Sequence, residues 1–147
     1  MQKRKIDVDE LKRIQLDILK QVDKFCRNND ITYYLAYGSL LGAVRHKGYI
    51  PWDDDIDIVM PRPDYERFKD EFNASEKNYK VRDYEIDNTF LYPSSKVEFV
   101  KSELKEFVKH PSKLGVNIDI FVLDAVRYDD HEIIRKLYKM NMLYNLK

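Results

Sequence analysis

The chain has 147 residues, of which 44% are hydrophobic and 13% aromatic, so it can form a packed core and is unlike a disordered protein. Its 26 basic residues balance 26 acidic ones, which argues against a general nucleic-acid binder. Cys26 is the only cysteine, so no intrachain disulfide is possible and a reducing compartment fits. Without a secretory signal or a run of 18 apolar residues, we expect a cytoplasmic protein, with contact at the inner membrane surface left open.

The N-terminal part predicts a helix followed by a strand. Apolar residues at spacings of three and four predict an amphipathic helix of about five turns that ends near residues 28–30. These residues are Leu11, Ile14, Ile18, Val22 and Phe25. Residues 31–36 are β-branched and aromatic, which predicts a strand. Gly38-Ser39 ends that strand and opens a short helical turn over residues 40–44.

The remaining elements follow in chain order after a turn at residues 49–52. A strand over residues 53–60 precedes a helix from about Asp64 to Phe72, which Pro63 or Asp64 would open. The later expectations are strands at 79–85, 96–101 and 115–124, a charged loop or short helix at 102–113, and a closing helix built on Ile133, Ile134, Leu137, Tyr138 and Met140. We therefore predict a single α/β (α+β) domain over residues 1–147, with a mixed sheet flanked by helices.

Acidic residues alternate with isoleucines in the predicted strand 53–60. Side chains on a strand alternate faces, so Asp53, Asp55 and Asp57 would share one face, with Asp55 and Asp57 roughly 7 Å apart at Cα. Two carboxylates on a half-buried strand repel each other and lose hydration, and a divalent cation would offset both costs. The pattern predicts a Mg²⁺ or Mn²⁺ site at Asp55 and Asp57, with Asp53 as an accessory ligand.

Three other interpretations of this acidic run stay open. A charged surface loop would accommodate the acids but would not explain the isoleucines between them. An EF-hand needs glycine at the sixth position of its loop, and counting from Asp53 that position is Ile58, with Asp64 at the twelfth. Salt bridges to nearby basic residues are also compatible with the acids, although they do not require the alternation.

A phosphate-binding region is predicted just before the acidic strand. A Gly38-Ser39 turn at the start of a helix can hold an anion through backbone N–H groups and the serine hydroxyl. Arg45 could bind phosphate oxygens through two N–H groups, and Lys47 could act as a point charge. The alternative for both basic residues is a solvated helix end.

A third acid is expected, because phosphoryl-transfer sites often use several carboxylates. Asp119 interrupts an apolar strand and is the preferred candidate, either as a metal ligand or as the base that takes the acceptor proton. Asp124 is the competitor, but its position at the strand exit is explained equally well by capping. Trp52 could stack on a base or on a choline-like cation, or it could anchor the core. The three histidines, His46, His110 and His131, have no metal-ligand spacing and are unassigned.

Two motifs resemble one protein family. The run LAYGSLLGAVRHKGYIPWDDDIDI, from Leu35 to Ile58, closely resembles the signature of the LicD family, and NIDIFVLD at residues 117–124 is similar to its second motif. That family comprises bacterial phosphocholine transferases, with fukutin-related proteins as distant relatives. The resemblance implies a nucleotidyltransferase-like fold, with Asp55, Asp57 and Asp119 as the matching acids and Gly38-Ser39 as the phosphate turn.

The resemblance also implies a reaction. Family members transfer a phospho-alcohol, typically phosphocholine from CDP-choline, to a sugar of a cell-surface glycan such as lipopolysaccharide or teichoic acid. Two alternatives stay open: a nucleotidyltransferase that moves NMP from an NTP, and a catalytically silent nucleotide-binding relative. Family members are usually much longer than this chain, so it is expected to be either a C-terminally shortened piece or a short relative.

Overall fold

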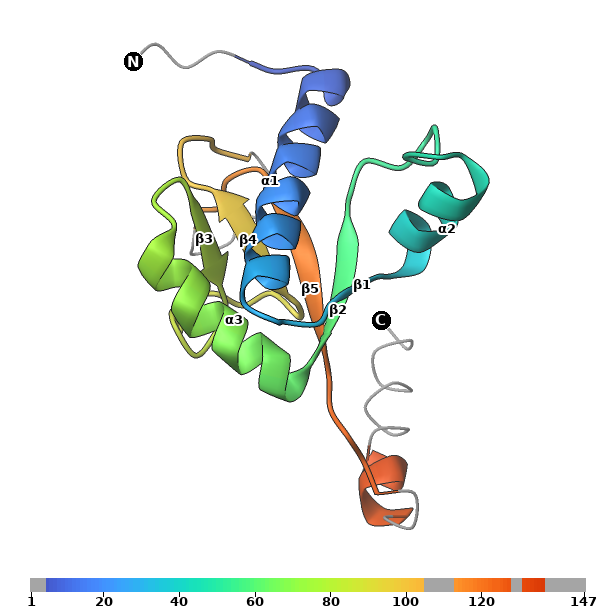
Figure 1. Ribbon diagram of the computed structural model, residues 1–147, viewed down its shortest axis with the longest axis vertical. Coiled ribbons are helices and arrows are strands. Elements are labelled where there is room, and N and C mark those ends of the chain that lie inside the picture. Colours follow the sequence, from blue (N-terminus) through green and yellow to red (C-terminus); the bar gives the residue numbers. More distant parts are fainter. Residues whose placement is uncertain (1–4, 105–112, 128–130, 137–147) are drawn as a thin grey trace.

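A mixed sheet of five strands, in the order β1-β2-β5-β4-β3, organises the chain (Figure 1). The computed structural model describes residues 5–104, 113–127 and 131–136. The strands are β1 (Tyr34–Leu35), β2 (Asp57–Pro61), β3 (Tyr79–Arg82), β4 (Ser95–Phe99) and β5 (Asn117–Leu123). The central strands β2 and β5 are parallel, and the other neighbouring pairs are antiparallel. The predicted α+β class, with a mixed sheet flanked by helices, is confirmed.

Helix α1 (Val8–Asn28) is the predicted amphipathic helix, longer by a turn at its start. The Asp7 side chain caps it by accepting a hydrogen bond of 2.8 Å from the Glu10 amide, which satisfies one N–H that has no partner within the helix. The helix ends at Asn28, and the chain leaves through Asp30, whose φ of 51° is tolerated by aspartate in turns.

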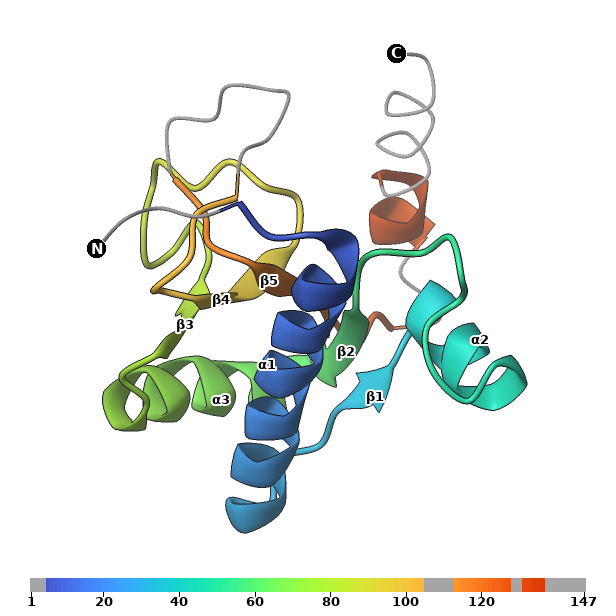
Figure 2. The same ribbon diagram turned by 90° about the horizontal axis from the view of Figure 1, so that it is seen from above.

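Helix α3 (Arg62–Ser75) starts directly after β2, with a proline in its first turn, where a missing N–H costs nothing. It lies on the same side of the sheet as α1 (Figure 2), and Phe25 of α1 packs edge-on against Phe68 and Phe72 of α3. The two helices and the sheet that they cover share one hydrophobic core. Its large, fully buried side chains are Ile18, Val22, Ile58, Met60, Tyr65, Phe68, Phe72, Val81, Val97, Ile118 and Ile120. Because strand side chains alternate, residues 57, 96 and 119 point to the opposite face.

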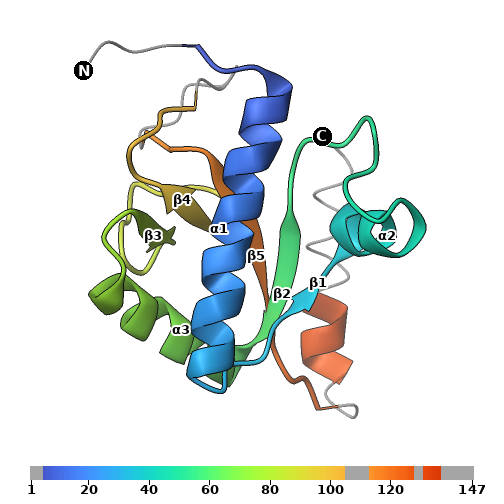
Figure 3. The same cartoon turned by 45° about the horizontal axis from the view of Figure 1, so that its top comes forward.

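Helix α2 (Tyr37–Arg45) lies beyond the β1 edge, away from α1 and α3 (Figure 3). It already contains Gly38 and Ser39, so the predicted turn is the first turn of this helix. Gly42, expected to weaken the helix, instead allows close packing: a Cβ there would lie 2.5 Å from the carbonyl oxygen of Gly48. The backbone after α2 therefore folds back tightly against it.

Two predicted strands are shorter than expected. The strand predicted at 31–36 is reduced to β1, whose two residues pair with Ile58 and Val59. The strand predicted from Asp53 begins only at Asp57, where its pairing with Asp119 of β5 begins. Residues 53–56 form a loop, which starts with a hydrogen bond of 3.0 Å from the Asp53 amide to the Ile50 carbonyl.

The other predicted elements differ mainly at their ends. The helix predicted at 64–72 extends over 62–75, and the strands predicted at 79–85, 96–101 and 115–124 are observed at 79–82, 95–99 and 117–123. Of the ambiguous segment 102–113, residues 105–112 lie outside the described residues. Residues 131–136 are helical, as predicted, whereas Leu137, Tyr138 and Met140 lie outside the described part. None of the helices in the described ranges is long and apolar enough to cross a membrane.

Candidate functional site

Asp57 and Asp119 lie side by side on the two central strands. They are direct partners in the parallel pairing of β2 with β5, and the Asp119 amide donates a 2.9 Å hydrogen bond to the Ile56 carbonyl. Neighbouring strands lie about 4.8 Å apart, so both carboxylates occupy the same small region of the open face. The pKa of Asp57 is raised by partial burial and by the charges of Asp119 and Asp53.

Asp53 and Asp55 join this pair although neither belongs to a strand. The pKa of Asp55 is raised to about 6 by partial burial together with a hydrogen bond to Asp53 and the charges of Asp57, Asp53 and Asp119. Asp55 keeps part of its surface in water, which screens some of this repulsion. The four carboxylates therefore form one electrostatic group, which we call the acid cluster. The predicted gathering of these acids is observed, but through a loop rather than along one strand face.

Helix α2 brings Gly38 and Ser39 to the acid cluster. A Cβ at Gly38 would lie 2.5 Å from Asp53 Oδ2, so the absence of a side chain lets this carboxylate approach the helix. The Ser39 hydroxyl accepts a hydrogen bond of 2.8 Å from the Asp57 amide. Ser39 therefore has a structural partner that the sequence did not predict, while its own proton can still be donated to an anion.

Lys96 and Ser94 also belong to the site and were missed from the sequence. Both donate to Asp119 Oδ1, Lys96 over 2.6 Å. Alternation along a strand places Lys96 and Ser94 on the same face, because they are two residues apart. The sequence does not reveal, however, that this strand lies next to the strand that carries Asp119. The pairing of β4 with β5 supplies that information.

Gln15 of α1 is a second residue that the sequence did not single out. Its side chain is buried and donates to the carbonyl oxygens of Asp54, at 2.9 Å, and Asn117, at 3.2 Å. The Tyr49 hydroxyl donates to the Gln15 amide oxygen over 3.1 Å. This one side chain thus ties the acidic loop to the start of β5. The feature of the sequence that could have indicated this role is the position of Gln15, a polar residue, within the apolar stripe of α1.

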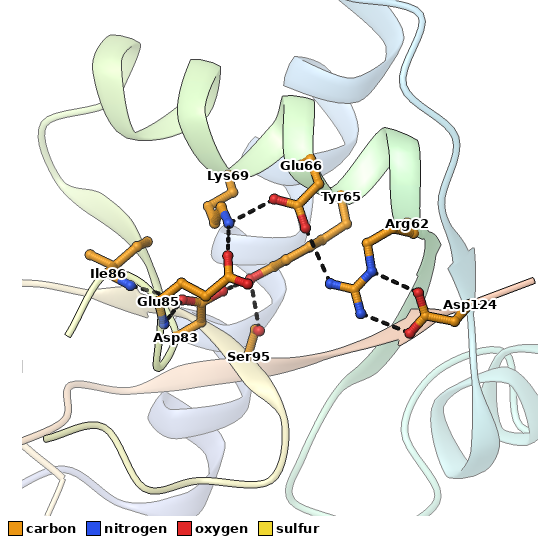
Figure 4. Close-up of polar contacts among 9 residues, drawn as sticks. All are labelled: Arg62, Tyr65, Glu66, Lys69, Asp83, Glu85, Ile86, Ser95 and Asp124. Carbon is orange, nitrogen blue, oxygen red and sulfur yellow. Dashed lines mark hydrogen bonds and ion pairs between the residues drawn. The ribbon is translucent and has the colours of Figure 1, made fainter. Parts of the chain in front are cut away.

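Asp124, the competitor of Asp119, lies away from the acid cluster. Its two carboxylate oxygens accept from Arg62 Nε and Nη2, both at 2.7 Å, at the start of α3 (Figure 4). The Arg62 charge lowers the pKa of Asp124. This ion pair gives Asp124 a structural role that needs no metal, through a side chain of α3 rather than through the cap of a turn or helix that the sequence suggested.

Figure 4 also shows how β4 is held on its helix side. The Tyr65 hydroxyl is buried and contacts Asp83 and, at 2.8 Å, the Ser95 hydroxyl. Ser95 faces α3, whereas its neighbours Ser94 and Lys96 face Asp119. The buried polar group around Tyr65 therefore fixes the strand that carries the cationic side of the site.

The basic residues predicted to bind phosphate, Arg45 and Lys47, and the predicted stacking residue Trp52 lie near the C-terminal end of α2, away from Gly38 and Ser39 at its start. Arg45 and Lys47 are exposed, and Lys47 Nζ donates to the Val44 carbonyl at 3.2 Å, as expected for a residue at a helix C-terminus. Trp52 is 78% exposed, so the core-anchor alternative is wrong. Its ring lies 6.4 Å from that of His46, whose Nδ1 is buried and has no hydrogen-bond partner. His131 is exposed and His110 lies outside the described residues.

The acid cluster has the right chemistry for a hard divalent cation but not a preformed cage. Mg²⁺ and Mn²⁺ prefer carboxylate oxygens, and such an ion would relieve the repulsion that raises the pKa of Asp55. Within residues 5–104, 113–127 and 131–136, no three His, Cys, Asp or Glu side chains are spaced to hold a metal as they stand. In the cluster, Lys96 already pairs with Asp119. The residues therefore fit the ion by composition, and binding would require this carboxylate to change partner.

Two surface hollows lie outside the acid cluster. One of about 470 Å³ is lined at the start of α1 by residues that include Glu10, Lys12 and Tyr49. Another of about 400 Å³ lies between α1 and the β1 edge and includes Tyr33 and Leu40. Neither contains any of the four clustered carboxylates, so neither bears on their chemistry.

Comparison with known proteins places these features in a family. The family model described as "LicD/FKTN/FKRP, nucleotidyltransferase domain" matches residues 30–131, which include all four acids. The lipopolysaccharide cholinephosphotransferase LicD of Haemophilus influenzae is 32% identical over 146 residues, covering 98% of this chain and 54% of that protein. An uncharacterised protein of Rickettsia prowazekii is 25% identical over 125 residues, covering 79% of this chain and 47% of that protein.

The chain thus spans about half the length of these curated relatives. No solved structure matches it. The family match covers more than half of the chain, and the Haemophilus relative aligns with nearly all of it. The chain therefore belongs to the LicD family.

Proposed function

We propose that this chain carries the catalytic core of a metal-dependent transferase, which moves a phosphocholine-like group from a CDP-alcohol to a sugar hydroxyl of a cell-surface glycan. The observation that carries the proposal is the in-register pair of Asp57 and Asp119 on adjacent parallel strands, with Asp53 and Asp55 beside it. The name of the Haemophilus relative, a lipopolysaccharide cholinephosphotransferase, supports the choice of group and acceptor.

In this proposal Asp55, Asp57 and Asp119 hold one or two Mg²⁺ or Mn²⁺ ions, with Asp53 as an accessory ligand. When bound, the cation would supply positive charge to phosphate oxygens that the acid cluster would otherwise repel. Gly38 leaves room for Asp53, and Ser39 holds the Asp57 backbone while its hydroxyl proton is directed to the donor.

The chemistry is a single displacement at phosphorus. The acceptor hydroxyl oxygen attacks the phosphorus that carries the alcohol, the bond to the nucleoside monophosphate breaks, and CMP leaves. A carboxylate of the acid cluster takes up the hydroxyl proton.

The exposed residues near the end of α2 would receive the alcohol and the phosphate oxygens of the donor. Trp52 offers an exposed indole face of the kind that binds quaternary ammonium groups. Arg45 is exposed on the same stretch and could pair with phosphate oxygens. Both assignments follow from exposure and chemistry.

The test is product analysis with purified protein. With CDP-choline, Mg²⁺ and lipopolysaccharide, we expect CMP release together with choline incorporation into the glycan. Asp57→Asn should abolish CMP release, whereas Asp54→Asn, whose exposed side chain lies next to the cluster, should retain it. Pyrophosphate release from NTPs would instead support a nucleotidyltransferase, and donor binding without turnover would support a silent relative.

A further inference from the structure

Lys96 stands in one row with Asp57 and Asp119. The register pairs Asp57 of β2 with Asp119 of β5, and Asp119 with Lys96 of β4, so three neighbouring strands each contribute one charged side chain to the same face. Lys96 Nζ lies 2.6 Å from Asp119 Oδ1, and both side chains are mostly buried, with 11% and 17% of their surfaces exposed. The ammonium is therefore at one end of the acid cluster.

The contacts of Lys96 point toward the site. Its Nζ also lies 5.3 Å from the centre of the Tyr92 ring. Among the described residues, Asp119 Oδ1 is the one hydrogen-bond acceptor of the ammonium, which carries three N–H donors. A buried ammonium is costly unless it is paired. Lys96 thus depends on Asp119 and retains donor capacity for a second anion.

A divalent cation and Lys96 compete for the same carboxylate. If Asp119 turns to a metal ion, the Lys96 ammonium loses its partner while β4 still holds it beside the strand that carries Asp119. An incoming phosphate would restore a partner to it, since lysine commonly binds phosphate as a point charge. The exchange would keep the charge of the site balanced as a cation and an anionic donor enter together.

We propose that Lys96 is an exchangeable cation of the acid cluster: it holds Asp119 in the ligand-free protein, and it moves to the phosphate oxygens of the nucleotide diphosphate donor when a divalent cation takes Asp119. This role rests on the proposed function, because it requires both the metal and the donor. It adds a donor-binding residue on β4, outside both sequence motifs of the family.

The alternative is a purely structural ion pair, and the two roles differ in their effect on binding of the donor nucleotide. Removal of the charge by Lys96→Met frees Asp119 and should tighten Mn²⁺ binding about tenfold, while weakening binding of CDP in the presence of Mg²⁺ by about tenfold. Lys96→Arg should weaken Mn²⁺ binding, because a guanidinium can hold Asp119 through two N–H groups. Removal of a purely structural lysine would also free Asp119 for Mn²⁺ but would leave CDP binding in the presence of Mg²⁺ unchanged, so unchanged CDP binding contradicts the proposed role.

The experiment measures Mn²⁺ binding by electron paramagnetic resonance and CDP binding by calorimetry, without turnover. Lys101→Met is the matched control, since Lys101 is exposed just beyond β4, and it should change neither affinity. If Lys96→Met does not fold, Lys96→Arg still tests the exchange through weaker Mn²⁺ binding. Unchanged or weaker Mn²⁺ binding by folded Lys96→Met overturns this role alone. Failure of the unaltered chain to bind Mn²⁺ overturns the proposed metal site and this role with it.

Discussion

The backbone amide of Asp57 donates a hydrogen bond of 2.8 Å to the hydroxyl oxygen of Ser39. On the other side of the same residue, the Asp57 carbonyl accepts from the Ala36 amide at 3.0 Å. The start of α2 and the start of β2 are therefore joined at the residue that also carries a clustered carboxylate. Helix α2, near the start of the first motif, therefore fixes the backbone of Asp57 near its end.

Ser39→Ala should destabilise the protein by about 1–3 kcal/mol, because the half-buried Asp57 amide loses its acceptor. Urea unfolding followed by circular dichroism measures this change. Ser75→Ala is the control, since its exposed hydroxyl only donates to the Phe72 carbonyl at the end of α3. It should cost less than about 0.5 kcal/mol. Equal effects of the two substitutions would contradict the assigned role of Ser39.

Three glycines of the first motif should respond differently to alanine. At Gly38 the new methyl group meets only the flexible end of Asp53, so the fold should survive while Mn²⁺ binding weakens. At Gly42 it meets backbone atoms of Gly48 and Ile50, which should cost about 1–3 kcal/mol. At Gly48 nothing lies within 4 Å, and the change should be neutral or slightly stabilising. Thermal melts and Mn²⁺ titrations of the three variants separate these outcomes.

Asp55 should make the metal-free protein less stable as the pH rises. Its pKa is raised from 3.8 to about 6, so between these values the folded protein binds more protons than the unfolded chain. Stability is therefore lost as the pH rises from about 4 through 6. Asp55→Asn removes this loss. Relative to the unaltered protein, the free energy of unfolding of the variant, measured with urea, should therefore be larger at pH 7.5 than at pH 4.5. A stability difference that is independent of pH would exclude the proposed repulsion.

Substitutions of Asp119 and Asp124 should have different effects on Mn²⁺ binding, although both residues belong to the second motif. Asp119→Asn should weaken Mn²⁺ binding, because Asp119 is the strand partner of Asp57. Asp124→Asn should leave Mn²⁺ binding unchanged and cost less than about 1 kcal/mol, since its pair with Arg62 is exposed. Titration of both variants under identical conditions decides the matter, and loss of metal binding by Asp124→Asn would reverse the assignment.

Gln15 should influence the site without touching any ligand. Gln15→Leu leaves the carbonyls of Asp54 and Asn117 without this donor, at a cost of about 1–3 kcal/mol. Because the acidic loop is then less well held, Mn²⁺ affinity should also fall in protein that is still folded. Gln21→Leu, elsewhere on α1, serves as the control for a change of the same type. Loss of stability with unaltered metal affinity would limit Gln15 to a structural role.

The sequence alone was sufficient for the elements with strong periodicity and for the family. The stripe along α1 and the apolar run of β5 are local patterns, and they predicted both elements with small errors at the ends. The two motifs led to the LicD family, which the comparisons confirm. The acids were also identifiable, because charged residues within apolar segments need partners. Their roles as metal ligands, and the single domain over the whole chain, stay predictions.

Only the tertiary structure determined which strands are neighbours and which distant side chains are in contact. Local periodicity does not determine strand order. The sequence therefore could not reveal that β4 places Lys96 beside Asp119, or that Arg62 of α3 forms an ion pair with Asp124. It also could not show that β2 begins at Asp57, because the start of a strand depends on where its neighbour pairs with it, here at Asp119 of β5. Hydrogen bonds and ion pairs between distant segments depend on the packed arrangement, and these contacts distinguish the clustered acids from the other carboxylates of the chain.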